Sequence, residues 1–214
     1  MNEQDNWLDS IRPLLAELER YALWINTQYR LGLQDKVTIL VQTKGTSAVY
    51  GHFRPLGWAR GDAKVHEISI AAEELARPVL DVLATVQHEM VHAGCNQAGI
   101  QDCAKSGRHN KRYQTAAVAA GLTCELMSKS RGYAATAMTE ETKRLVEDAF
   151  QPDIAAFGLC RLVPAKRQTK AASQVAYICP ICGTKARAHR DTLLVCGHCT
   201  PKGHSRVDMQ AQGD

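Results

Sequence analysis

The sequence lacks any run of apolar residues that approaches the length of a membrane span. A secretory signal peptide is not expected either, because residues 1–6 are polar and acidic and no apolar segment follows them. Hydrophobic residues make up 45% and charged residues 22% of the chain, which is ordinary for a folded globular protein. We therefore expect a cytoplasmic protein (nucleoid-associated if it is bacterial) with no membrane partner, and no pattern indicates an oligomer.

Disulfides are not expected either, although the chain has eight cysteines, because the cytoplasm keeps thiols reduced. Two CxxC pairs, Cys179/Cys182 and Cys196/Cys199, are separated by residues 183–195, the spacing of a zinc ribbon. Four thiolates complete a tetrahedral site, so this zinc should be structural and supply much of the folding energy of so small a module. We expect a strand at 193–195, and we note that His198 could compete with one cysteine. The other cysteines are expected to be buried or incidental thiols: Cys95, Cys103, Cys124 and Cys160.

A pentapeptide of the form HExxH, residues 88–92, lies where a helix is expected. Pro78 suits a first helical turn, and apolar residues from Val79 to Met90 recur at helical spacing. Since each helical residue turns the chain by about 100°, His88 and His92 lie one turn apart, opposite the apolar stripe, with Glu89 beside them. Two imidazoles and a carboxylate that can deprotonate water are the parts of a zinc hydrolase site, and two surface histidines are the alternative.

A catalytic zinc needs a third protein ligand and one open position. Cys95 and Ala98 stand where metzincins place glycine and histidine, so that class is excluded. We expect His109 to be the third ligand, brought back to the helix by a loop that nearby glycines allow. The glycines concerned are Gly94, Gly99 and Gly107, and the other candidate ligands are Glu125, Asp102, His66 and His52.

The segment 88–93, with Asp102-Cys103, the segment 107–110 and Tyr113, resembles the SprT-like metalloprotease domain. That family includes the bacterial SprT proteins and the DNA-dependent protease Spartan. The resemblance covers roughly residues 5–150 and extends to the two CxxC pairs. It implies an α+β, zincin-like domain with zinc ligands at His88, His92 and His109 and a catalytic base at Glu89. Animal members often have Gly-His-Gly around the third ligand, whereas this sequence has Arg-His-Asn, which is closer to bacterial and mobile-element variants.

Apolar periodicity predicts the remaining elements of the first domain. We expect an amphipathic helix from Trp7 to Ile25, a strand at 37–41, a weaker strand at 50–53 followed by turns at Gly57 and Gly61, and helices at 111–122 and 140–150, the last capped by Thr139. The strand at 65–70 either borders the cleft and pairs with an extended substrate or is an ordinary sheet strand. His66 is expected to line the cleft or face solvent, and Tyr113 to pack in the core rather than touch substrate.

Charge divides the chain unevenly, since residues 1–158 carry a net charge of −2 and residues 159–214 a net charge of +6. We predict a metalloprotease domain at 1–158, a basic linker at 159–175 and a zinc ribbon at 176–207. Basic residues concentrated on a small metal-bound module indicate nucleic-acid binding, and a solvated tail is the alternative. The best candidates for phosphate contacts are Lys185, Arg187 and Arg190, between the two CxxC pairs.

Two classes of function compete. The first is a zinc-dependent endopeptidase, which by resemblance would act on DNA-associated or DNA-crosslinked proteins. The second is a DNA-binding accessory or regulatory protein on a retained peptidase scaffold. Glu89 favours the enzyme, because a scaffold without catalysis has no need of that carboxylate. A zinc nucleobase deaminase is excluded, since it requires H-x-E and here glutamate follows histidine directly.

Overall fold

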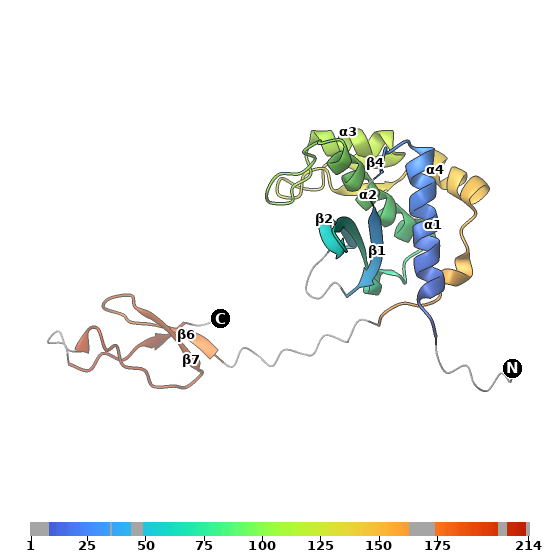
Figure 1. Ribbon diagram of the computed structural model, residues 1–214. Coiled ribbons are helices and arrows are strands. Elements are labelled where there is room, and N and C mark those ends of the chain that lie inside the picture. The colour runs from blue at the N-terminus through green and yellow to red at the C-terminus, as the bar shows by residue number, and fades with distance from the viewer. Residues whose placement is uncertain (1–8, 35, 44–48, 163–173, 201–204, 213–214) are drawn as a thin grey trace, which may run out of the picture. The chain divides into compact units, whose positions relative to one another are not determined.

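The chain divides into two compact units, Met1–Val163 and Pro164–Asp214. Most of the predicted basic linker falls on residues 163–173, which lie outside the described residues. Among the residues described, no helix is both long and apolar enough to cross a bilayer. The computed structural model describes residues 9–34, 36–43, 49–162, 174–200 and 205–212 (Figure 1).

The first unit combines helices with two separate sheets, so it is a mixed α/β structure consistent with the predicted α+β class. In the larger sheet β3 lies in the centre, parallel to β1 and antiparallel to β2. The smaller sheet is the antiparallel pair of β4 and β5. The elements are α1 (Arg12–Gln28), β1 (Val37–Gln42), β2 (Gly51–Arg60), β3 (Ala63–Ala71), the 3₁₀ turn η2 (Ala72–Glu74), α2 (Val79–Gln97), α3 (Lys111–Ala119), β4 (Leu122–Glu125), β5 (Ala135–Met138), α4 (Glu140–Leu145), the π-helical turn η3 (Val146–Phe150) and the 3₁₀ turn η4 (Ile154–Phe157).

The core of the first unit lies where α1 and α2 pack against each other and against the larger sheet. Leu18 of α1, Ile68 of β3 and Leu83 of α2 are fully buried there. Each such side chain contributes about 1.5–3 kcal/mol relative to an exposed one. The predicted amphipathic helix is confirmed from Arg12 onward, while Trp7 lies outside the described residues.

Several predicted elements are confirmed. The strand expected at 37–41 is β1, and the helix expected at 140–150 is α4 continued by η3. Thr139 caps α4 as expected, because its hydroxyl accepts a hydrogen bond of 3.1 Å from the backbone N–H of Thr142.

Other elements differ from the prediction. The weak strand expected at 50–53 is the ten-residue β2, and Gly57 lies in a bulge within it rather than in a turn. The helix expected to reach Leu122 ends at Ala119, because Gly121 turns the chain with φ +78° where a Cβ would lie 2.3 Å from the hydroxyl of Tyr29. The hairpin of β4 and β5 was not predicted, since four-residue strands give too short a pattern.

The second unit is a small three-stranded sheet with β6 in the centre. The strand predicted at 193–195 is wrong, because only Val195 forms a bridge there, with Asp208. The strands are β6 (Gln174–Ile178), β7 (Lys185–His189) and β8 (Gln210–Ala211).

Candidate metal centre and active site

Helix α2 presents two histidines one turn apart, as its sequence predicts. The apolar stripe that includes Leu83, Val86 and Met90 is buried, and His88 and His92 lie half-buried outside it. The stripe therefore fixes the rotation of the helix about its axis, and this rotation turns both imidazoles away from the core.

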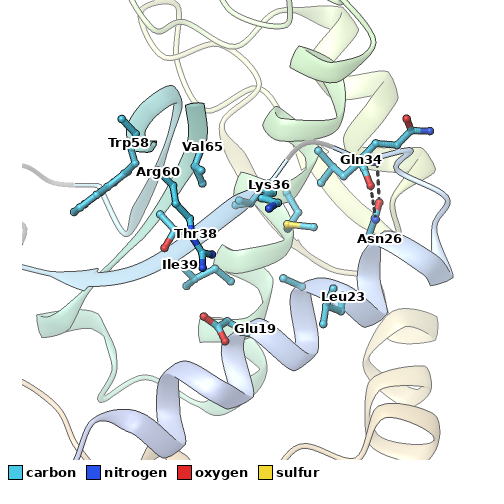
Figure 2. A pocket seen from close by; sticks show the side chains of 15 residues that line it. Glu19, Leu23, Asn26, Gln34, Lys36, Thr38, Ile39, Trp58, Arg60 and Val65 are labelled. Carbon is cyan, nitrogen blue, oxygen red and sulfur yellow. Dashed lines mark hydrogen bonds between the residues drawn. The ribbon is translucent and has the colours of Figure 1, made fainter. Parts of the chain in front are cut away.

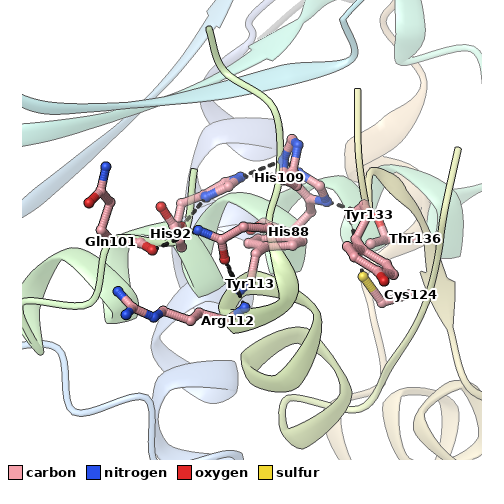
Figure 3. A network of polar contacts seen from close by, with 11 residues as sticks. His88, His92, Gln101, His109, Arg112, Tyr113, Cys124, Tyr133 and Thr136 are labelled. Atoms are coloured by element: carbon pink, nitrogen blue, oxygen red, sulfur yellow. Dashed lines mark hydrogen bonds and ion pairs between the residues drawn. The ribbon is translucent and has the colours of Figure 1, made fainter. Parts of the chain in front are cut away.

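His109 joins these two histidines from the loop that follows α2 (Figure 3). The Nε2 atom of His109 lies 3.2 Å from Nε2 of His88 and 3.0 Å from Nε2 of His92. The Nε2 atoms of His88 and His92 are 3.3 Å apart. The chain leaves α2 through Gly99 and turns again at Gly107, with φ of +67° and +79°. Gly94 lies inside α2 instead, where a Cβ would approach the carbonyl of Leu31 to 3.1 Å.

The loop between β4 and β5 holds His109 in place. The backbone N–H of His109 donates to the carbonyl of Arg131 at 3.0 Å, and its carbonyl accepts from the N–H of Tyr133 at 3.2 Å. Gly132 lies between these contacts with φ +71°, and a Cβ there would lie 2.0 Å from the carbonyl oxygen of His109. Only glycine fits this position, so the unpredicted hairpin is part of the site.

The other ring nitrogens of the helix histidines have partners that fix the imidazoles. Nδ1 of His88 lies 2.8 Å from the hydroxyl of Thr136, and Nδ1 of His92 lies 2.5 Å from Oδ2 of Asp102. These contacts fix the orientation of both rings, so that each Nε2 faces the common centre. Tyr113 is fully buried behind the rings, with its ring centroid 4.4 Å from that of His92, so its predicted core role is confirmed.

The three Nε2 atoms form a donor set that fits a zinc ion. Nitrogens bound tetrahedrally to zinc lie about 3.3–3.4 Å apart, because each Zn–N bond is about 2.0–2.1 Å long. The observed separations of 3.0–3.3 Å match that spacing closely. Three protein ligands leave one tetrahedral position for a reactant, which is the pattern of a catalytic rather than a structural site.

Burial and neighbouring charges shift the pKa values of the site in opposite directions. Burial lowers the pKa of His88 well below its usual range, and burial together with His92 lowers that of His109 to about 4. Burial would also lower the pKa of His92, but hydrogen bonds to Asp102 and Cys103 outweigh it and raise the value to about 10. Neutral His88 and His109 are already in the form that binds a metal ion.

Glu89 lies beside the histidines and against β2. It is only 5% exposed, and burial raises its pKa to about 7 even though His92 and the backbone N–H of Phe53 favour the carboxylate. A Cβ on Gly51 would lie 3.2 Å from Oε1 of Glu89, so the absence of a side chain at Gly51 makes room for this carboxylate. A group with a pKa near neutrality is suited to accept and return a proton.

The rival candidates for the third ligand lie elsewhere or have other partners. Oδ2 of Asp102 lies against Nδ1 of His92, and with His92 and Cys103 it forms a separate group that could hold a metal ion. Glu125 is exposed on β4. His52 is hydrogen-bonded to Glu67 at 3.1 Å. His66 is 3% exposed, so the expectation that it lines the cleft or faces solvent is wrong. Cys95 is buried, as predicted.

The four cysteines of the second unit form a second donor set, which could bind a metal ion. Sγ of Cys179 lies 3.8 Å from Sγ of Cys199, and Sγ of Cys182 lies 3.7 Å from Sγ of Cys196. Thiolates bound tetrahedrally to zinc at about 2.3 Å lie about 3.8 Å apart, so this set also fits zinc, and it leaves no open position. His198 is not a member of this group.

The predicted phosphate-binding residues lie on and after β7. Lys185 and Arg187 are exposed and alternate with half-buried alanines, so their side chains share one face of the strand with His189. Arg190 is exposed in the turn that follows.

A second basic surface borders the histidine site. The loops 101–110 and 126–134 are joined by a hydrogen bond of 2.8 Å from Nε of Arg108 to the carbonyl of Lys129. Residues 101–134 carry six basic and two acidic side chains, and one of these acids, Asp102, is bound to His92. The basic residues are Lys105, Arg108, Lys111, Arg112, Lys129 and Arg131.

The first unit also contains a cavity of about 680 Å³ between α1, β1 and the ends of β2 and β3 (Figure 2). Its walls include Leu23, Thr38, Ile39, Trp58 and Val65. The histidines and Glu89 are not among its lining residues, so this cavity is separate from the candidate active site.

Comparison of the chain with family models, with curated proteins and with solved structures found no match.

Proposed function

We propose that the chain is a zinc-dependent endopeptidase of the SprT-like type, with a zincin-like first unit that binds a catalytic zinc and a ribbon that binds a structural one. The observation that supports this most strongly is the meeting of three Nε2 atoms within 3.3 Å of one another, next to the buried Glu89. A histidine cluster that only stabilised the fold would not require a costly buried carboxylate beside it.

The residues of the site would divide the work. His88, His92 and His109 would hold the zinc, which when bound supplies Lewis acidity toward the scissile carbonyl and lowers the pKa of the attacking water. Glu89 would take a proton from that water and return it to the leaving amine. The hydrogen bond from the N–H of Phe53 keeps the Glu89 carboxylate in place during this exchange.

Strand β2 is the better candidate for pairing with an extended substrate. The strand at 65–70 was one candidate, but it is the centre of the sheet and has neighbours on both sides. Among the described strands, β2 is at the end of that sheet, and it borders Glu89 through Gly51 and Phe53. A substrate strand added there would bring its backbone next to the catalytic carboxylate.

The substrates we propose are DNA-associated or DNA-crosslinked proteins. This proposal rests on the family resemblance and on the basic face of β7, where the exposed Lys185 and Arg187 would contact phosphates. The surface at 101–134 is the second candidate for nucleic-acid binding, because it is basic and borders the histidines.

The test of catalysis is incubation with a protein crosslinked to DNA, and with the same protein free. We expect the wild-type chain to cleave it and Glu89→Gln to be inactive while retaining two zinc ions. Glu125→Gln removes a carboxylate that is exposed on β4 and should stay active. If the wild type does not cleave protein with zinc bound at both sites, a DNA-binding accessory role replaces this proposal.

The test of the nucleic-acid surface compares two sets of substitutions. Neutralising Lys185, Arg187 and Arg190 together should weaken DNA binding and reduce its salt dependence, because fewer counterions are released. A fragment that ends near Ala165 should then bind DNA poorly. If that fragment binds DNA as tightly as the full chain, the surface at 101–134 is the binding site, and neutralising Lys105, Lys129 and Arg131 should abolish binding.

A further inference from the structure

Strand β2 contains a bulge that exposes two large apolar side chains. Its register against β3 shifts between Arg54 and Trp58. Within the bulge Leu56 has φ of 51°, a left-handed conformation that leucine rarely adopts. The side chain of Leu56 is 53% exposed and that of Trp58 is 47% exposed. Conformations of this kind persist only where the surrounding structure holds them.

Two buried polar residues in the centre of the sheet hold the bulge. The N–H of Leu56 donates to Nδ1 of His66 at 3.1 Å, and the indole N–H of Trp58 donates to Glu67 at 2.6 Å. His66 is 3% and Glu67 is 5% exposed.

The carboxylate of Glu67 is further satisfied by the hydroxyl of Ser69 at 2.9 Å and by Nε2 of His52 at 3.1 Å. A central strand normally carries apolar residues at such positions, because a buried charge is costly unless it is hydrogen-bonded. The bulge therefore combines a strained backbone at Leu56 with two buried polar side chains, His66 and Glu67.

The bulge continues the strand that borders the catalytic carboxylate. The backbone N–H of Phe53 in β2 is hydrogen-bonded to Glu89, and Leu56 follows three residues later, which is at most about 10 Å away along the chain. Trp58 also forms part of the wall of the cavity in Figure 2, so exposed apolar surface extends beyond Leu56. A polypeptide that runs along β2 from Glu89 would pass the bulge within a few residues of its scissile bond.

We propose that the bulge of β2 is a substrate subsite, in which Leu56 and Trp58 contact an apolar side chain of the polypeptide. His66 and Glu67 are positioning residues for this subsite. The inference rests on the proposed endopeptidase activity and adds a preference for an apolar residue a few positions from the cleaved bond.

The test uses two short unstructured peptides, one with leucine at alternate positions and one with serine in place of each leucine. Leu56→Asn removes the apolar side chain but keeps the left-handed backbone, which asparagine tolerates. We expect the ratio of kcat/KM for the leucine peptide to that for the serine peptide to fall about five-fold, since a half-exposed leucine offers only part of its surface. The matched control is Val118→Asn on α3, whose side chain is 57% exposed, and it should leave the ratio unchanged.

Glu67→Gln tests the positioning role. This substitution weakens the hydrogen bond that holds the Trp58 indole, so the ratio of kcat/KM for the leucine peptide to that for the serine peptide should fall. If Glu67 only stabilised the fold, kcat/KM would fall equally for both peptides. An unchanged ratio in Leu56→Asn, or an equal loss for both peptides, would overturn the subsite.

If the wild type cleaves neither peptide, the proposed activity fails, but the affinity for the two peptides still tests whether the subsite exists. Glu89→Gln with fluorescein-labelled peptides should then bind the leucine peptide more tightly by anisotropy, and Leu56→Asn added to it should remove the difference. Equal affinity for the two peptides would refute the subsite independently of catalysis.

Discussion

The two candidate metal centres differ in how much of the surrounding structure depends on them. The histidines lie at the edge of a large core that contains Leu18, Ile68 and Leu83, none of which needs a metal ion in order to pack. In the second unit the hydrophobic cluster consists of Cys179, Cys196, Cys199 and Val207, with Met209 packed against it. The ligands of the cysteine site are therefore themselves the core, so a metal there would hold the fold together.

The two centres also differ in their number of candidate ligands. Three nitrogens leave a coordination position for a reactant, whereas four thiolates leave none. The hydroxyl and N–H of Thr184 form hydrogen bonds that lower the pKa of Cys182 to about 6, which favours the thiolate that binds metal. The histidine centre thus has an open position on a unit that packs without metal, whereas a metal at the cysteine centre would stabilise the fold of the second unit.

The largest expected effect is on the cysteine centre. Cys179→Ser or Cys196→Ser should unfold residues 174–212 and release one zinc ion, because metal binding supplies folding free energy of about 10–16 kcal/mol in isolated zinc modules. The first unit should keep its thermal transition, and NMR would show the loss confined to the second unit. Cys160→Ser, a half-buried cysteine outside both donor sets, is the control. A lost transition in the first unit would show that the two units fold together.

A substitution at the histidine centre tests whether the first unit folds without its metal ion. His109→Ala should lower the zinc content from two to one per chain and abolish proteolysis, while the unfolding temperature of the metal-free first unit changes little. His52→Ala replaces a histidine outside the donor set and should retain both ions. Two zinc ions in His109→Ala would mean that His109 is not a ligand.

Local patterns predicted the parts of the structure that are built locally. Residues 88–92 lie on one helix, so the helical period alone places His88 and His92 together. The CxxC pairs likewise bring their thiols together within a few residues. No period relates His109 to α2, so it was chosen from several candidates as the next histidine along the chain, and the family resemblance implied the same residue.

The parts that were left open or missed depend on contacts between distant segments. Alternating residues identified the strand at 65–70, but they could not show that it is the centre of the sheet, because strand order is set by partners far away in the sequence. Asp102 was weighed as a third ligand, and its carboxylate lies against Nδ1 of His92 rather than among the three Nε2 atoms. Thr136 was not considered, because it lies on a short strand that aligns with His88 only after folding.

The partners of the imidazoles should have graded effects that distinguish orientation from ligation. Asp102→Asn keeps the size of the side chain but removes the charge that binds Nδ1 of His92, so the zinc affinity of the histidine site should fall about 10–100-fold. Competition with a chromophoric chelator measures this loss, and Asp81→Asn, an exposed acid on the same helix, is the control. Complete loss of the ion, as expected for His109→Ala, would indicate that Asp102 is a ligand.

The smallest effect is expected for Thr136→Val, which keeps the shape of the side chain and removes one neutral hydrogen bond to Nδ1 of His88. A neutral hydrogen bond contributes about 0.5–1.5 kcal/mol, which corresponds to a loss of zinc affinity of roughly 2–13-fold. The charged partner of His92 should matter more, because hydrogen bonds to ionised groups are about twice as strong. The same chelator competition applied to Thr136→Val and Asp102→Asn orders the two contacts. A larger loss for Thr136→Val would show that His88, rather than His92, is the imidazole whose orientation limits metal binding.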